Sequence, residues 1–308
     1  MKRLNILTAR KVDRFRIDFL QKQKSLNRPL ILDGANGSLL KQATKFEDNI
    51  LWSSILNITN PEKVIALHKE YIDSGAVIIT TNTFRTNPTV YKQLNINLSN
   101  EEFIQSSVQL AIESRNEKEI IIAGSNAPAE DCYQIERTIP KYDLEYNHKK
   151  HIELLWESGV DVIWNETQGH WDEIETISKF CSSNYIPFVM NFFFTSELNL
   201  LSGEHLTDAI KMVEDYSPIS VGFNCVKPEQ FLKYYERNEL PKSWGLYLNC
   251  GAGNVEDKNI SCGIEPKEYV DLLKPFLKSN PLFVGSCCGS NPNHTKAIKE
   301  YFNEVYGN

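Results

Sequence analysis

The sequence contains no apolar run long enough to cross a membrane, which takes about 20 residues. Its N-terminus, MKRLNILTARKVDRFRIDFL, begins with basic residues but places charged side chains such as Arg10, Lys11 and Asp13 where a secretory signal would be apolar. We therefore expect a cytoplasmic protein with no membrane partner.

An excess of basic residues is also missing. The 33 lysines and arginines are outnumbered by 40 aspartates and glutamates, which gives a net charge of -7. Nucleic acids and anionic membranes are bound by basic surfaces, so we expect neither of them as a partner.

The chain has no regular cysteine framework either. Disulfide-stabilised proteins are typically short and secreted and carry an even number of cysteines, whereas this chain has 308 residues and seven cysteines at irregular spacings. Free thiols or metal ligands are the better interpretation in a reducing compartment. The seven are Cys132, Cys181, Cys225, Cys250, Cys262, Cys287 and Cys288.

No low-complexity tract, long linker or shift in composition divides the chain. Hydrophobic residues make up 41% of it, which is enough for a full core. A chain of this length could form two domains, but α/β barrels of this size are single domains.

A recurring pattern is present instead. Short apolar runs end in small or polar residues, and a segment of helix length usually follows each run. Continuous apolar strands without alternation are typical of a parallel sheet that is buried on both faces. The eight runs are PLILDGANGS from Pro29, AVIITTNTF from Ala76, EIIIAGSNAP from Glu119, VDVIWNETQG from Val160, IPFVMNFFFT from Ile186, ISVGFNCV from Ile219, WGLYLNCGAG from Trp244 and LFVGSCCGS from Leu282.

The intervening segments predict helices. Proline suits a first helical turn and glycine suits the exit, and the segment Pro61–Gly75 has both. Helices are also predicted over Glu145–Gly159, Glu265–Leu277 and Pro292–Tyr306, and the pattern weakens around Glu197–Lys211.

Eight strand–helix units predict an α/β fold, a (β/α)8 TIM barrel over residues 29–308. A doubly wound open sheet is the competing interpretation, but DGANGS after the first strand is not the G-x-G-x-x-G fingerprint of such a fold. We expect residues 1–28 to form a short N-terminal helical extension that closes the bottom of the barrel.

Polar side chains gather where the predicted strands end. In a barrel these ends meet at one mouth, where active sites lie. The strands deliver Asp33 and Gly34, then Thr80, Asn82 and Thr83, then Ser125 and Asn126, then Asn165, Glu166 and Thr167, then Asn191, Asn224, Cys225, Asn249, Cys250, Cys287 and Cys288.

Three of these residues are candidate metal ligands. Cys225 ends the sixth strand, and Cys287 and Cys288 end the eighth between two glycines. Three thiolates can hold Zn²⁺ with one tetrahedral position left open, which is the pattern of catalytic zinc. Cys250 could be a substitute ligand, a spare thiol or a packing residue, and packing is the favoured interpretation. Buried packing is the interpretation for Cys132, Cys181 and Cys262.

Several motifs in this order resemble a known family. DGANGSLL, TNTF, GSNAP, NETQGHWDE, GFNC and GSCCGS are similar to motifs of the homocysteine S-methyltransferases over about Pro29 to Tyr306. That family uses a zinc-dependent (β/α)8 barrel, which also forms the homocysteine-binding module of cobalamin-dependent methionine synthase and of the betaine-dependent enzyme. The resemblance implies that Cys225, Cys287 and Cys288 are zinc ligands.

The resemblance also implies a substrate site. Asp33 and Gly34 would hold the amino-acid end of homocysteine, and Glu166 would accept hydrogen bonds from its ammonium. Ser125 would lie near the substrate carboxylate or the mouth, and Asn224 would orient the cysteine loop. The sequence departs from the usual family motifs at Asn36, Ser38, Asn126, Ala127 and Ser286. The changes at Asn126 and Ala127 would alter the contacts of the third-strand loop and could reshape the methyl-donor side.

The implied reaction is methyl transfer to the thiol of homocysteine, giving methionine. The donor would be a sulfonium, S-methylmethionine or S-adenosylmethionine, or alternatively a quaternary ammonium such as betaine. Because no folate- or cobalamin-binding module follows Asn308, we expect a stand-alone enzyme with a direct donor. The competing hypotheses are a barrel that binds zinc or a thiol amino acid without catalysis, and a thiol oxidoreductase that uses Cys287 and Cys288 as a redox pair.

Aromatic side chains at the mouth would attract a cationic donor. Trp52, in a loop before a helix, is the best candidate, and Phe84, at the end of TNTF, is another. Arg85 is a candidate for binding a donor carboxylate. Four more aromatic candidates lie at strand ends and loop starts, where packing is the usual role: Trp164, Trp171, Phe193 and Phe194.

Overall fold

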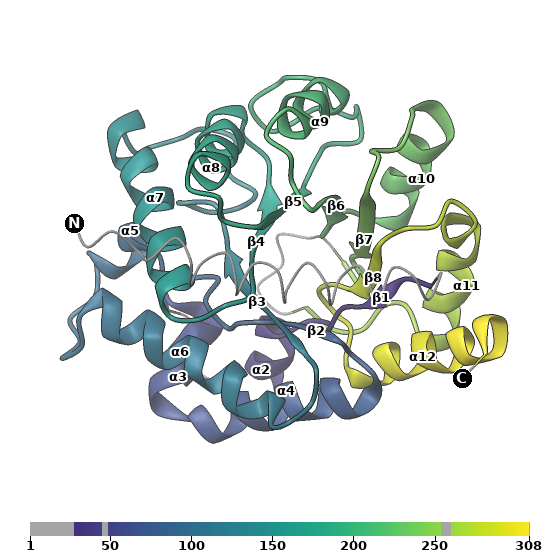
Figure 1. Cartoon of the computed structure of the whole chain (residues 1–308), viewed down its shortest axis with the longest axis horizontal. Coiled ribbons are helices and arrows are strands. Elements are labelled where there is room, and N and C mark those ends of the chain that lie inside the picture. The colour runs from purple at the N-terminus through teal and green to yellow at the C-terminus, as the bar shows by residue number, and fades with distance from the viewer. Residues whose placement is uncertain (1–27, 45–48, 254–259, 308) are drawn as a thin grey trace.

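The strands form a central parallel sheet that is surrounded by helices (Figure 1). A computed structural model describes residues 28–44, 49–253 and 260–307. Within these ranges eight strands are found, each ending at the same side of the molecule because all pairings are parallel. The strands are β1 (Leu30–Ile31), β2 (Ile78–Thr80), β3 (Ile121–Asn126), β4 (Val162–Gln168), β5 (Phe188–Phe192), β6 (Ser220–Asn224), β7 (Trp244–Leu248) and β8 (Phe283–Ser286).

The sheet closes into a barrel. Its hydrogen-bonded order is β1-β8-β7-β6-β5-β4-β3-β2, so that only the contact between β1 and β2 is left to complete the circle. A parallel bridge between Leu32 and Ile78 supplies that contact, supported by the bond from Asp33 N to the carbonyl of Ile78 at 3.0 Å. The predicted (β/α)8 TIM barrel is confirmed.

Helices cover the outside of the barrel, and the four predicted between and after the strands are present. The helices are α2 (Gly37–Thr44), the 3₁₀ helix η1 (Trp52–Ile55), α3 (Leu56–Thr59), α4 (Pro61–Ser74), α5 (Pro88–Tyr91), α6 (Asn100–Arg115), α7 (Lys141–Glu157), α8 (Trp171–Ser183), α9 (Leu206–Glu214), α10 (Pro228–Arg237), α11 (Pro266–Leu277) and α12 (Pro292–Tyr306). In Figure 1 the chain follows the barrel in order from α4 round to α12, which returns beside β1.

The helix ends follow local chemistry. α4 begins at Pro61 and is closed by Gly75, whose φ of 115° is the left-handed conformation that glycine adopts without strain. α7 begins four positions before the predicted Glu145, because Pro140 is extended and the chain can turn into a helix directly after it. α9 is short, as the weak pattern before it indicates.

The interior of the barrel changes character along each strand. Alternate residues point inward. The lower layer is apolar and contains Leu30, Ile78, Ala123, Trp164 and Phe283. Two positions further along the same strands stand polar residues such as Thr80, Ser125 and Glu166. The strands therefore build a packed floor below a polar chamber.

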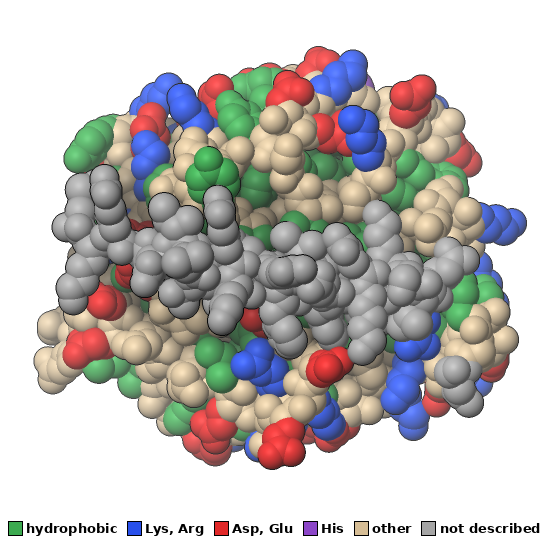
Figure 2. All heavy atoms as spheres, in the orientation of Figure 1, with side chains coloured by type: hydrophobic (Ala, Val, Ile, Leu, Met, Phe, Trp, Pro, Cys, Tyr) green, Lys and Arg blue, Asp and Glu red, His purple; other side chains and the backbone are tan. Residues whose placement is uncertain are grey.

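The outer surface carries both signs of charge. Figure 2 shows acidic and basic side chains interspersed on the part of this face that belongs to described residues. Among those residues no helix has the length and apolar character that a bilayer crossing requires. The predicted N-terminal extension, residues 1–28, falls outside the described ranges except for its last residue.

Candidate metal and substrate site

A cavity of about 1240 Å³ opens at the carboxyl ends of the strands. The residues predicted as metal ligands and for the homocysteine site lie on its wall, together with three of the donor-pocket candidates. These residues are Asp33, Gly34, Trp52, Phe84, Arg85, Ser125, Glu166, Asn224, Cys225, Cys287 and Cys288. The fold thus brings together side chains from six of the strands and the loops that follow them.

Three thiols meet at one side of this cavity. The Sγ atom of Cys225 lies 3.1 Å from that of Cys287 and 3.6 Å from that of Cys288, and all three lie within 4.8 Å of one another. Sulfurs bound at about 2.3 Å to one tetrahedral ion would be about 3.8 Å apart. The thiols are therefore spaced closely enough to share one metal ion after small side-chain adjustments.

Local backbone geometry aims these thiols. Cys225 follows β6 with a φ of 58°, an uncommon left-handed conformation for a residue with a side chain. Gly289 follows the cysteine pair with a φ of 83°, and a Cβ there would lie 2.4 Å from the Cα of Gly251. The turn that presents two consecutive cysteines to one point thus requires glycine at this exit.

Hydrogen bonding concentrates negative charge on one sulfur. The thiols of Cys287 and Cys288 and the hydroxyl of Tyr133, 3.2 Å away, lower the pKa of Cys225 well below its ordinary value. The pKa values of Cys287 and Cys288 are raised, first of all by their bonds to Cys225. The cluster therefore favours one thiolate shared between two thiols, an arrangement ready to accept a cation.

Asp33 lies buried next to the cavity floor. Its Oδ2 atom accepts hydrogen bonds from Thr80 N at 2.8 Å and from Asn36 Nδ2 at 3.1 Å. Burial outweighs these bonds and raises the pKa of Asp33 to about 8. The carboxyl is rigidly held, and a cationic ligand group would favour its ionised form.

Glu166 projects into the cavity from β4. Ser125 donates to its Oε1 at 2.5 Å and Tyr247 donates to its Oε2 at 3.2 Å. Burial nevertheless raises the pKa of Glu166 to about 7. Two hydroxyl donors fix both oxygens, so that the carboxyl can turn neither away from the cavity nor around its own axis.

Asn224 connects Glu166 to the cysteine cluster. Its Oδ1 accepts from Thr167 N at 2.8 Å, and its Nδ2 donates to Thr167 Oγ1 at 2.9 Å. Thr167 follows Glu166 with a φ of 56°, where the register of β4 against β5 is irregular. Asn224 directly precedes Cys225, so its two hydrogen bonds tie the end of β6 to the strained backbone at Thr167, next to Glu166.

A family model for the homocysteine S-methyltransferases matches residues 30–302 of the chain. The chain belongs to the homocysteine S-methyltransferase family. The predicted family is confirmed, and with it the prediction of an enzyme.

Individual relatives are similar to the chain along most of its length. Betaine-homocysteine S-methyltransferase of Drosophila melanogaster is 26% identical, with 87% of this chain and 92% of the relative covered. Homocysteine S-methyltransferase 2 of Zea mays is 22% identical, with coverage of 89% and 90%. The metallated form of the Escherichia coli homocysteine methyltransferase MmuM superposes with a TM-score of 0.74 at 22% identity, covering 89% of this chain and 96% of that one, which supports the fold.

The departures from the usual family motifs fall into two groups. Asn36 and Ser286 line the cavity, and Asn36 donates to Asp33 and to Thr80 Oγ1. Asn126 instead points away from the barrel interior, where its Oδ1 lies 2.8 Å from Nδ1 of His151. The change at Asn126 therefore alters the packing of α7 rather than the wall of the cavity.

The aromatic candidates separate clearly. Trp52 and Phe84 form an edge-to-face pair with ring centroids 6.0 Å apart on the cavity wall. Gly37 makes room for the indole, since a Cβ there would lie 2.2 Å from Trp52. The other four candidates do not line this cavity: Trp164 packs in the barrel floor, Phe193 and Phe194 join the outer core, and Trp171 is partly buried against that core.

Arg85 lies at the cavity wall with its charge already engaged. Its Nη1 donates to the carbonyl of Glu130 at 2.7 Å, and its Nη2 lies 3.7 Å from Asp131. The side chain thus contacts the loop after β3.

The remaining cysteines have mixed outcomes. Cys181 and Cys250 are buried packing residues, and Cys250 N donates to the carbonyl of Cys288 at 2.8 Å. Cys132 is buried as predicted but also lines the cavity. The prediction was wrong for Cys262, which is exposed because it follows the β7 loop at the rim.

Two contributors to the site were not predicted. Tyr247 stands on β7 two positions before Asn249, so strand alternation alone would have indicated that it points inward. Tyr133 lies in the irregular loop after β3, where periodicity gives no direction for a side chain. No sequence signal would have placed its hydroxyl beside Cys225.

Proposed function

We propose that this protein transfers a methyl group from a cationic donor to the thiol of homocysteine, giving methionine. The observation that carries the proposal is a three-cysteine cluster that shares one cavity with two buried carboxyls, Asp33 and Glu166. A site for a thiol amino acid needs both features: the cysteine cluster would hold the metal that binds the substrate sulfur, and the carboxyls would bind the substrate ammonium.

Cys225, Cys287 and Cys288 would hold Zn²⁺ in this proposal. When bound, zinc with an open position supplies a means of deprotonating a substrate thiol at neutral pH. Three thiolates give the ion a net charge of about -1 by simple addition, which keeps a bound sulfur electron-rich. We place the reaction in the cytoplasm, where reducing conditions keep these thiols free.

Glu166 and Asp33 would bind the ammonium of homocysteine. Ser125 and Tyr247 hold the Glu166 carboxyl in place, and Thr80 and Asn36 hold that of Asp33. Because burial disfavours both negative charges, an ammonium in this chamber would be favoured over a neutral group. Gly34 lies beside Asp33 on the wall, where the substrate backbone would approach.

The donor site would lie along Trp52 and Phe84. A sulfonium or quaternary ammonium is attracted to ring faces, and the anionic cluster favours a cation nearby. In the transfer, the donor's bond to the methyl carbon breaks, its electron pair stays on the donor atom, and a new sulfur–carbon bond forms. S-methylmethionine or S-adenosylmethionine is the favoured donor, with betaine as the alternative in view of the Drosophila relative.

A donor screen on zinc-loaded protein tests the proposal. Methionine formation is measured with homocysteine and each of S-methylmethionine, S-adenosylmethionine and betaine. We expect turnover with one of them, and loss of both zinc and turnover in Cys288→Ala but not in the control Cys181→Ala. Zinc binding without turnover would favour the non-catalytic barrel. Absence of metal together with a two-hydrogen mass change on reduction would favour the thiol oxidoreductase.

A further inference from the structure

The loop between β3 and α7 covers the cysteine cluster. Residues 127–140 form no helix or strand, yet several of them line the cavity. Tyr133 lies at the centre of this loop. Its ring packs edge-to-face on Phe193 with centroids 5.1 Å apart, and its hydroxyl donates to Cys225 Sγ at 3.2 Å. The position of the loop therefore decides whether Cys225 receives this hydrogen bond.

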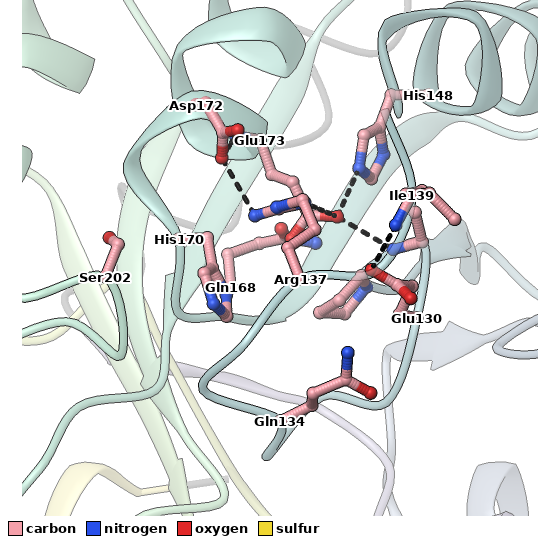
Figure 3. A network of polar contacts seen from close by, with 12 residues as sticks. Glu130, Gln134, Arg137, Ile139, His148, Gln168, His170, Asp172, Glu173 and Ser202 are labelled. Carbon is pink, nitrogen blue, oxygen red and sulfur yellow. Dashed lines mark hydrogen bonds and ion pairs between the residues drawn. The ribbon is translucent and has the colours of Figure 1, made fainter. Parts of the chain in front are cut away.

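One carboxylate oxygen holds both ends of the loop. Oε1 of Glu173, in the first turn of α8, accepts from Ala129 N at 2.8 Å and lies 3.3 Å from Arg137 Nη1. The same atom lies 3.0 Å from Nε2 of His148 on α7. Figure 3 shows Glu173 between Arg137 and His148, with Asp172 as a second partner of the arginine at 2.8 Å.

This clamp is buried and charged. The Glu173 side chain is 2% exposed and that of Arg137 is 18% exposed. Burial alone would raise the pKa of Glu173, but His148, Arg137 and the Ala129 amide together lower it to about 2. Breaking a buried charge pair by removing one partner leaves the other uncompensated, so the loop has a strong preference for this arrangement.

We propose that Glu173 is a positioning residue for the metal site. It fixes residues 127–140 in the geometry in which Tyr133 donates to the Cys225 thiolate. A hydrogen bond to a ligating thiolate withdraws electron density from it and orients it, which sets metal affinity and spectroscopy. This inference rests on the proposed function, because it requires that Cys225 bind a metal.

The test compares Tyr133→Phe, Glu173→Gln and the double variant. Zinc dissociation constants are measured by competition with a chromophoric chelator, and the cobalt-substituted proteins are compared by their thiolate-to-cobalt absorption. We expect each single variant to weaken zinc binding about tenfold and to shift the absorption to lower energy. The double variant should be no worse than either. Glu145→Gln, which alters a half-buried ion pair on α7 away from the loop, should match the wild type.

Other results would overturn the inference. One is a Glu173→Gln variant that unfolds more easily but has wild-type zinc affinity and cobalt absorption. Another is a double variant in which the two losses multiply. If Glu173→Gln does not fold, Arg137→Gln breaks the same clamp at a less buried position and must give the Tyr133→Phe phenotype. A wild-type protein that binds neither zinc nor cobalt overturns the proposed function, and this inference with it.

Discussion

The carboxyl group of Glu166 accepts hydrogen bonds from two hydroxyl groups, and its pKa lies near neutral pH. Its pKa is raised from 4.5 to about 7 by burial, although Ser125 and Tyr247 oppose the shift. An unfolded chain loses this proton at a lower pH than the folded chain does. Between those two pH values Glu166 is protonated more often in the folded protein than in the unfolded chain, so its contribution to stability falls as pH rises.

We therefore predict that, as pH rises from about 5 to about 7, the metal-free protein loses stability relative to Glu166→Gln, which cannot titrate at this position. Asp33, with its pKa raised to about 8, acts in the same direction as Glu166. His68 and His151, whose pKa values burial lowers to about 4 and about 3, act in the opposite direction in both proteins. Urea unfolding across this range measures the effect. The stability of the wild type minus that of Glu166→Gln should fall as pH rises through this range, and parallel curves for the two proteins would contradict the assignment.

Glu166 should matter for homocysteine binding more than for the methyl-transfer step. A hydrogen bond to a charged group contributes about 1.5–3 kcal/mol, so Glu166→Gln should raise the KM for homocysteine by about 10- to 100-fold. The kcat should change much less. Steady-state kinetics on zinc-loaded protein checks this, with Tyr247→Phe as a comparison that removes one supporting bond to Glu166 and should raise KM less. A fall in kcat at unchanged KM would assign Glu166 a different role.

At the scale of elements, the barrel floor depends on glycines that face an aromatic ring. A Cβ on Gly245 of β7 would lie 2.4 Å from the ring of Phe283 on β8. The same ring would lie 2.9 Å from a Cβ on Gly222, and Trp164 packs against it with centroids 4.7 Å apart. Phe283 therefore fills space that two neighbouring strands leave open.

Gly245→Ala should reduce the unfolding free energy by about 1–3 kcal/mol, the usual effect of overpacking a core. Chemical denaturation measures the change. Gly169→Ala is a suitable control, because the nearest atom to its Cβ, 3.0 Å away, belongs to the flexible Leu201 side chain. Equal losses at the two positions would show that backbone effects rather than the Phe283 contact decide the cost.

The elements were more predictable than the loops between them. Apolar runs ending in polar residues located β4 with Glu166 and β6 with Cys225, because burial on both faces imposes that pattern. The loop of residues 127–140 carries no periodic signal, since its position depends on side chains from distant elements, among them Glu173 and Asp172. The same reason explains why Tyr133 could not be predicted.

At the scale of the whole molecule, metal and fold should be coupled. A ligand present at 100 times its dissociation constant stabilises the folded state by about 2.7 kcal/mol. Zinc should therefore raise the midpoint of thermal unfolding by several degrees, and a chelator should reverse the rise. Cys288→Ala should show neither effect in calorimetry. A zinc-dependent rise that persists in Cys288→Ala would mean that the stabilising ion is bound elsewhere.

The three sulfurs are also separated along the chain: Cys225 and Cys287 lie 62 positions apart, and the later pair directly follows β8. The ribosome must synthesise β8 and the two cysteines after it before a metal ion can bind all three sulfurs. A nascent or truncated polypeptide that stops before Cys287 would hold only Cys225. Only chains that have been synthesised through Cys288 and have closed the barrel would then bind the metal. The metal content of the protein in cells would therefore report the fraction of chains that have folded.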